Sequence, residues 1–379
     1  MKAFLILEDG NVFTGKSIGS TREMISEIVF NTSMTGYLEV LTDPSYAGQA
    51  VVMTYPLIGN YGVCYVDMES KKPWVDGYIV RETARYPSNF RSEDSIDTFL
   101  KENDIPGIKG IDTRALTKIL REKGTMNGMI TTNENFVPED VVKQLKAHHT
   151  AKVVEKVTCK EKHSYLSKDY VANDVEEARS GLKIHPYRKS NCRVALLDYG
   201  SKDNIAESLL KRGCDVTIYP ALTQAEEIIA DGPDGIMLSN GPGDPKECTQ
   251  IIEEIKKLYH TDIPIFAICL GHQLMALATG GDTRKLKYGH RGANHPVKDL
   301  KTGRVYISTQ NHGYVVEDGT IGAKVAETSF INANDGTVEG MHYLGKNIFT
   351  VQFHPEACSG PQDTEFLFDE FIQMMEVSK

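Results

Sequence analysis

The sequence lacks a long hydrophobic run, and this absence excludes two classes of protein. Only the five apolar residues Ala3 to Leu7 follow the opening Met1-Lys2 pair, whereas a secretory signal needs an apolar core of roughly 7 to 15 residues. The longest later apolar run, Ile263 to Leu270, contains Pro264 and is far shorter than the roughly 18 residues that cross a bilayer. We therefore expect neither a signal peptide nor a membrane as a partner.

Cysteine is scarce and irregularly placed. The seven cysteines are an odd number, and no two of them form a Cys-x-x-Cys pair, so neither a disulfide framework nor a zinc site is indicated. The histidines also lack the Cys, Asp or Glu spacing that converges on a metal ion. We therefore expect no metal in this chain, and a reducing, cytoplasmic location.

Positive charge is in deficit. The formal net charge is −10, from 42 basic and 52 acidic residues. This charge repels phosphate backbones and anionic lipid wherever no local basic patch opposes it. Nucleic acid is therefore not expected as a partner.

Apolar residues are abundant enough for two packed domains. The chain has 379 residues, 40% of them hydrophobic, whereas a domain usually takes about 150. The first part, 1–150, mixes short strands with helical patterns at Thr113 to Lys123 and Pro138 to His148, and predicts a mixed β/α domain. A charged, poorly periodic stretch over 151–191 predicts a linker, and a second domain is expected over 192–379.

From Arg193 the sequence alternates strand and helix patterns. We expect strands at Val194–Leu197, Val216–Tyr219, Gly235–Leu238 and Pro264–Ile268, and helices at Asp203–Arg212, Gln224–Ala230, Lys246–Leu258 and Leu270–Thr279. Such alternation is typical of βαβ units, so it predicts an α/β fold with an open, mostly parallel sheet flanked by helices. The remainder is β-rich up to a closing helix at Asp363 to Met375.

One early segment has the letter pattern of a nucleotide-binding loop. Gly10 to Ser17 matches G-x-x-x-x-G-K-[ST]. A true phosphate-binding loop follows a strand and opens a helix, whereas Asp9-Gly10 predicts a hairpin turn and Val12-Phe13 its returning strand. A non-enzymatic nucleotide-binding or regulatory subunit is therefore kept only as a competing interpretation.

Cys269 lies where a buried strand is predicted to run into a helix. This is the position of a nucleophile elbow, whose sharp turn holds the reactive atom above the sheet edge. Gly271 lets the neighbouring backbone approach, and the helix N-terminus favours the thiolate. A small buried core residue is the alternative, but the strand-Cys-x-Gly-helix context favours a nucleophile.

Two further segments supply what such a thiol needs. His354 ends a predicted strand and is a candidate base, and Glu356 could accept a hydrogen bond from its other ring nitrogen. The turn from Ser239 to Pro245 follows another strand, at the edge where the active sites of open parallel sheets gather. Its glycine N–H groups and that of Leu270 could bind an oxyanion.

These motifs resemble those of the class I, or triad-type, glutamine amidotransferases. Further segments are similar to the small, glutaminase subunits of carbamoyl phosphate synthetase: Phe30–Tyr37, Leu41–Tyr46, Tyr55–Asn60, Ile111–Arg114, Gly289–Pro296 and Gln310–Gly313. Together they cover nearly the whole chain. One departure is Ala267, where many relatives carry glycine, and alanine is tolerable there if φ is negative.

The resemblance implies a reaction and its partners. A Cys269, His354 and Glu356 triad would hydrolyse L-glutamine to glutamate and ammonia. A large subunit, on which ATP and Mg²⁺ are expected, would use the ammonia and bicarbonate to make carbamoyl phosphate for arginine or pyrimidine synthesis; no cofactor is expected in this chain. The family's glutamine-binding positions correspond to Ser45, Gly241, Gly243, Leu270, Gln273, Asn311, Gly313 and Tyr314.

An alternative enzyme is a free-standing thiol amidohydrolase such as a γ-glutamyl peptidase. The first domain argues against it, because a soluble hydrolase would not require that domain. A purely structural or regulatory subunit would be expected to have lost the cysteine, and Cys269 is present.

Overall fold

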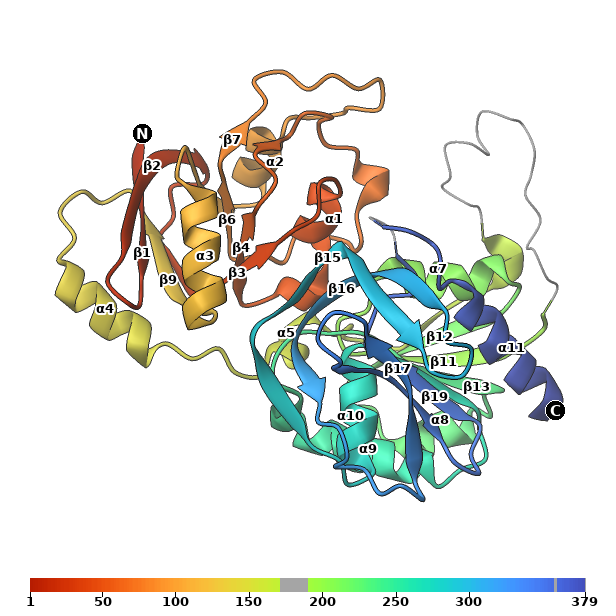
Figure 1. Ribbon diagram of the computed structural model, residues 1–379. Helices are drawn as coiled ribbons and strands as arrows, with labels where there is room; N and C mark the ends of the chain where they lie inside the picture. The colour runs from red at the N-terminus through yellow and green to blue at the C-terminus, as the bar shows by residue number, and fades with distance from the viewer. Residues whose placement is uncertain (171–189, 358–359, 379) are drawn as a thin grey trace. The chain divides into compact units, whose positions relative to one another are not determined.

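The computed structural model describes residues 1–170, 190–357 and 360–378, and the chain divides into two compact units. The first comprises Met1–Val153 and Leu286–Gly292, and the second comprises Val154–Lys285 and Ala293–Lys379. In Figure 1 the first unit begins in red at the N-terminus, and the second ends in blue. None of the helices in the described part combines the length and apolar character that a bilayer crossing needs.

The first unit is built on a closed barrel, with the strand order β1-β2-β8-β6-β4-β3-β9. Its strands are β1 (Lys2–Leu7), β2 (Val12–Gly19), β3 (Met24–Asn31), β4 (Gln49–Met53), β6 (Gly77–Val80), β8 (Pro106–Lys109) and β9 (Met126–Thr131). Outside the barrel, β5 (Leu57–Ile58) pairs with β7 (Glu82–Thr83). The helices are α1 (Tyr37–Thr42), α2 (Ile96–Glu102), α3 (Thr113–Lys123) and α4 (Pro138–Ala147), with 3-10 turns η1 (Pro44–Tyr46) and η2 (Tyr65–Asp67). The predicted mixed β/α character is confirmed.

Helix α3 shows how local sequence signals fix an element of this unit. The carboxylate of Asp112 accepts a hydrogen bond from the N–H of Ala115, as an N-cap side chain does. Leu116 and Leu120 lie four residues apart and are fully buried in the same cluster as the barrel strands, because residues at this spacing share one helix face. The helix occupies the predicted range.

The nucleotide-binding interpretation of Gly10 to Ser17 is wrong. Strands β1 and β2 pair antiparallel, with Leu5 opposite Phe13, and Gly10 has φ of +88° in the turn between them. The Lys16-Ser17 pair lies inside β2 and opens no helix. The segment is a β-hairpin, so its backbone N–H groups are arranged for strand pairing rather than around a phosphate.

The second unit is built on a mixed sheet whose described strands follow the order β10-β12-β11-β13-β14-β19-β18-β17-β15-β16. They are β10 (His163–Tyr165), β11 (Arg193–Asp198), β12 (Asp215–Pro220), β13 (Gly235–Leu238), β14 (Ile265–Ile268), β15 (Thr283–Asp299), β16 (Val305–Val316), β17 (Ala326–Asn332), β18 (Val338–Tyr343) and β19 (Ile348–Val351). The neighbours from β12 to β19 are parallel, which confirms the predicted parallel sheet. The β-rich remainder extends it with antiparallel strands.

Helices cover both faces of this sheet. They are α5 (Val153–Val157), α7 (Asp203–Lys211), α8 (Ala225–Ala230), α9 (Thr249–Tyr259), α10 (Leu270–Ala278) and α11 (Phe366–Ser378), with 3-10 turns η3 (Ser167–Asp169) and η4 (Pro245–Glu247). Helices α8, α9 and α10 share a core with Ala195 and Leu197, whereas α7 and α11 share another with Val194 and Leu196. Because successive strand side chains point to opposite faces, the two groups of helices lie on opposite sides of β11.

Three local expectations differ from the structure. The helix expected from Lys246 begins with the turn η4, because the Asp244 carboxylate accepts from Lys246 N and closes a tight turn at Pro245, and α9 starts only at Thr249. The last helix, α11, runs later than the expected Asp363 to Met375. The stretch expected as a linker contains α5 and β10, and β10 pairs with β12; its residues 171–189 lie outside the described ones.

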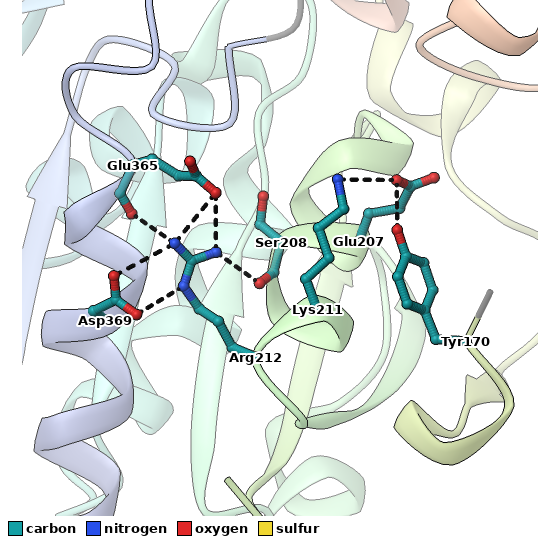
Figure 2. A network of polar contacts seen from close by, with 7 residues as sticks. All are labelled: Tyr170, Glu207, Ser208, Lys211, Arg212, Glu365 and Asp369. Atoms are coloured by element: carbon teal, nitrogen blue, oxygen red, sulfur yellow. Dashed lines mark hydrogen bonds and ion pairs between the residues drawn. The ribbon is translucent and has the colours of Figure 1, made fainter. Parts of the chain in front are cut away.

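Arg212 ties the last helix to the rest of the second unit (Figure 2). Its guanidinium donates to Asp369 Oδ1 at 2.9 Å and to Glu365 Oε1 at 3.2 Å, and it also donates to the backbone oxygen of Ser208 at 3.0 Å. The side chain is buried, and a buried guanidinium is tolerated only when its donors are satisfied. These hydrogen bonds connect α11 to the C-terminal end of α7.

Candidate active site

Cys269 forms a strained junction between β14 and α10. Its φ is +53° and its ψ is −103°, a conformation that costs a non-glycine residue about 1–3 kcal/mol. The strain is held by neighbouring backbone: Cys269 N donates to Val351 O at 2.8 Å, and Gln273 N donates to Cys269 O at 3.2 Å. A strained, buried cysteine at the carboxyl end of a parallel strand is the geometry of a nucleophile elbow.

The backbone around this junction is packed so closely that two positions have no room for a side chain and are glycine. A Cβ on Gly271 would lie 2.5 Å from Leu238 O, and a Cβ on Gly241 would lie 2.2 Å from Tyr199 O. Neither contact can exist, so only glycine lets α10 approach the end of β13 and lets the turn after β13 approach the residue after β11 this closely. Ala267 lies inside strand β14 and is fully buried, and it is not among the described non-glycine residues with positive φ.

His354 and Glu356 form an enclosed, hydrogen-bonded pair. His354 Nδ1 lies 2.7 Å from Glu356 Oε1, and neither side chain is exposed. Lys202 Nζ lies 3.2 Å from the same carboxylate oxygen. Because a carboxylate can only accept, Nδ1 carries the proton, and Nε2 is the ring nitrogen that can take up another.

The charges of this group set its protonation. Burial and Lys202 act to lower the pKa of His354, but Glu356 and Cys269 outweigh them and raise it to about 9. Burial acts to raise the pKa of Glu356, but His354 and Lys202 outweigh it and lower it to about 2. Glu356 is therefore ionised at neutral pH, and its carboxylate favours the imidazolium form of His354.

Polar groups surround the sulfur of Cys269. Gln352 Nε2 donates to Sγ at 3.5 Å, and Sγ donates to Asn311 O at 3.7 Å. His354 Nε2 is buried, and Cys269 is one of the groups that raise the pKa of His354. That nitrogen is consequently available to receive the thiol proton.

The turn after β13 is fixed by a short set of hydrogen bonds. Ser239 Oγ accepts from Tyr199 N at 2.9 Å and donates to Asn240 O at 2.8 Å, and Asn240 Oδ1 accepts from Lys202 N at 3.1 Å. Gly243 has φ of +93°, which glycine adopts without strain. Leu270 is the first residue of α10, so its N–H has no partner within the helix and can serve an oxyanion.

The remaining predicted binding residues fall into two places. Gln273 Nε2 donates to Tyr314 O at 2.8 Å, so the contact uses the backbone of Tyr314 and is indifferent to its ring. Asn311, Gly313 and Tyr314 all lie on β16. Ser45 belongs to the first unit, where its N–H donates to Oδ1 of Asp43, the N-cap of η1, at 2.8 Å. All the predicted residues except Ser45 thus belong to the second unit, where Cys269 Sγ contacts Asn311 and Gln273 contacts Tyr314; their roles stay predictions.

Sequence reasoning missed Lys202 and Gln352. Lys202 comes shortly after β11, at the carboxyl edge where sites of parallel sheets gather. Gln352 comes two residues before His354, and period 2 places alternate residues of an extended chain on the same face. Both positions can be read from the sequence, but whether the side chains make a contact depends on how the folded chain packs.

Comparisons with known proteins agree along the whole chain. A family model described as carbamoyl-phosphate synthase small chain, CPSase domain, matches residues 5–130. A second model, glutamine amidotransferase class-I, matches residues 195–374. The two matches therefore divide between the two halves of the chain.

Curated relatives are similar over nearly their full lengths. A carbamoyl phosphate synthase small chain of Clostridium perfringens is 51% identical over 373 residues, which is 98% of this chain and 99% of the relative. A protein of the same name from Listeria monocytogenes is 50% identical, over 99% of this chain and 97% of the relative. A carbamoyl phosphate synthase pyrimidine-specific small chain of Halalkalibacterium halodurans is 46% identical, over 100% of this chain and 98% of the relative.

Proposed function

The chain belongs to the family of carbamoyl phosphate synthase small chains, and on that premise we propose that it is the glutaminase component of a glutamine-hydrolysing carbamoyl phosphate synthase. The observation that carries the proposal is the strained Cys269 in a site that also holds the His354–Glu356 pair at 2.7 Å. A thiol with a base and an orienting carboxylate is the arrangement for covalent hydrolysis of an amide.

In the proposed reaction the thiol proton of Cys269 passes to His354 Nε2, and the thiolate attacks the side-chain amide carbon of glutamine. The carbonyl oxygen takes the negative charge, and backbone N–H groups near Gly241 and Leu270 stabilise it. As the C–N bond breaks, protonated His354 gives its proton to the departing ammonia. Water then cleaves the thioester, which releases glutamate and returns the thiol.

Glu356 and Lys202 support this proton transfer without touching the substrate. The carboxylate of Glu356 keeps the proton of His354 on Nδ1 and stabilises the imidazolium that forms. Lys202 lies 3.2 Å from that carboxylate and compensates its buried charge. Loss of either group would leave an unbalanced charge in an enclosed site.

The ammonia is proposed to pass to a large synthetase subunit, the expected partner of a small chain. ATP and Mg²⁺ are assigned to that subunit, and this chain to glutamine alone, with no cofactor of its own. Carbamoyl phosphate made in this way would serve arginine synthesis, pyrimidine synthesis or both, in the cytoplasm. In neutral water released ammonia becomes ammonium, which is not nucleophilic, and this chemistry favours direct transfer between subunits.

The test is the Cys269→Ser variant in complex with the large subunit. We expect glutamine hydrolysis to be lost, because a serine hydroxyl is a far weaker nucleophile than a thiolate at neutral pH. Synthesis of carbamoyl phosphate from added ammonia should persist, which serves as the control for an intact complex. A variant that keeps a sizeable fraction of the wild-type glutaminase rate would show that Cys269 is not the nucleophile.

A further inference from the structure

Gln352 connects the sulfur of Cys269 to Gln273. Its side chain is fully buried, immediately after β19. Oε1 of Gln352 accepts from Gln273 Nε2 at 2.9 Å, and Nε2 of Gln352 donates to Cys269 Sγ at 3.5 Å. The backbone is also fixed, because Gln352 N donates to Glu339 O at 2.9 Å.

The orientation of both amides follows from one backbone carbonyl. Tyr314 O can only accept, so the group of Gln273 that lies 2.8 Å from it must be the NH₂. The same NH₂ faces Gln352, whose oxygen must therefore point toward Gln273. The NH₂ of Gln352 is then left to face the sulfur. A flip of either amide would place two donors or two acceptors together.

We propose that Gln352 stabilises the thiolate of Cys269 and that Gln273 holds the Gln352 amide in the orientation this requires. The proposal rests on the proposed function, in which Cys269 is the nucleophile. When the thiol proton moves to His354 Nε2, the sulfur becomes an anion, and the N–H···S contact becomes charge-assisted. When Sγ then bonds to the amide carbon, the negative charge moves to the carbonyl oxygen. Gln352 therefore acts while the sulfur is an anion, before the attack on glutamine and again when water displaces the sulfur from the thioester.

Loss of the Gln352 hydrogen bond should change the reactivity of the Cys269 sulfur in two opposed ways. If loss of the hydrogen bond moves thiol ionisation up by about one pH unit, the thiolate fraction at neutral pH falls about tenfold. The remaining thiolate is more basic and therefore about threefold more nucleophilic, since nucleophilicity rises with a Brønsted slope of about 0.4–0.5. The net loss of sulfur reactivity at pH 7 is about threefold.

The experiment measures alkylation of Cys269 by iodoacetamide without glutamine, by mass spectrometry of the peptide that contains it, between pH 5 and 10. In Gln352→Met the alkylation rate at pH 7 should fall about threefold and the half-maximal pH should rise about one unit. Gln273→Met should shift the profile in the same direction by less, because it frees the Gln352 amide without removing it. Gln352→Leu serves the same test if the methionine variant does not fold, as judged by circular dichroism.

Thr350→Val is the matched control. Thr350 lies two residues before Gln352, is fully buried, and its Oγ1 is 2.7 Å from His272 Nδ1. This variant loses a buried hydrogen bond from the same segment without touching the sulfur, so its alkylation profile should match that of wild type. Because glutamine is absent, a role of Gln352 in packing or in substrate binding alone would not move the profile.

The outcomes separate this proposal from the proposed function. A Gln352→Met profile that overlays that of wild type, or a Thr350→Val profile that shifts equally, overturns the role of Gln352. A shifted Gln352→Met profile in a chain whose wild type hydrolyses no glutamine, alone or with the large subunit, supports the role of Gln352 and overturns the proposed function.

Discussion

At the scale of single residues, His354 and Glu356 have different proposed roles, so their replacement should lower the glutaminase rate by different factors. We predict that His354→Asn lowers the glutaminase rate by about 10²–10⁴, the usual worth of general acid-base assistance. Glu356→Gln should cost less, because orientation is weakened while the imidazole remains. Steady-state glutamine hydrolysis measures both, and a Glu356→Gln variant slower than His354→Asn would contradict the assigned order.

The role of Glu356 also predicts the direction in which the pH profile of the Glu356→Gln variant should move. Glu356 is one of the groups that raise the pKa of His354 to about 9, so its replacement lowers that pKa. The imidazolium, which donates the proton to ammonia, is then lost at a lower pH. The alkaline limb of kcat/KM should therefore move to lower pH in Glu356→Gln, and an unmoved or opposite limb would be inconsistent with the electrostatic role of Glu356.

Residue patterns in the sequence were sufficient for the core of the candidate site but not for its surroundings. Cys269, His354 and Glu356 could be chosen because each ends or follows a strand, and the topology of a parallel sheet brings such positions to one edge. Lys202 and Gln352 were missed, since their positions near the same edge are visible in the sequence but a position alone does not show which side chains touch. Their significance lies in distances of 3.2 Å to Glu356 and 3.5 Å to Cys269, which only the fold establishes.

At the scale of elements, the Arg212 cluster makes α11 dependent on one side chain (Figure 2). We predict that Arg212→Leu lowers the free energy of unfolding by about 1–3 kcal/mol, because hydrogen bonds between charged groups are lost. Lys211→Leu is the matched control: its pair with Glu207 is 3.8 Å long and partly exposed, and such pairs contribute about 0–1 kcal/mol. Urea unfolding measures the free energy of unfolding of both variants. An equal decrease in Arg212→Leu and Lys211→Leu would refute a special role for Arg212.

Elements were predicted best where capping and burial agree. Helix α3 has both an N-cap at Asp112 and a buried stripe, and strand β13 is short, apolar and fully buried; both occupy the predicted ranges. Helix α9 was expected too early because the Asp244-Pro245 turn resembles a helix start and closes as a separate 3-10 turn. The closed barrel of the first unit was not predicted beyond its β/α class, because strand order depends on pairing between distant segments.

At the scale of the whole molecule, the first unit is proposed to dock the large subunit, since it carries none of the proposed triad. We predict that a chain lacking Met1–Lys152 no longer co-purifies with that subunit and gains no glutaminase rate from it. This boundary keeps α5 and β10, which the second unit needs for its sheet and core.

Ser45→Ala separates docking from glutamine binding, because the deletion also removes Ser45. In the full-length chain this variant should still co-purify with the large subunit, while the KM for glutamine rises if Ser45 contacts the substrate. Pull-down on the tagged large subunit measures docking, and circular dichroism verifies that the shortened chain is folded. Retained co-purification and partner-stimulated hydrolysis by the folded, shortened chain would place the docking surface in the second unit, where the proposed triad also lies.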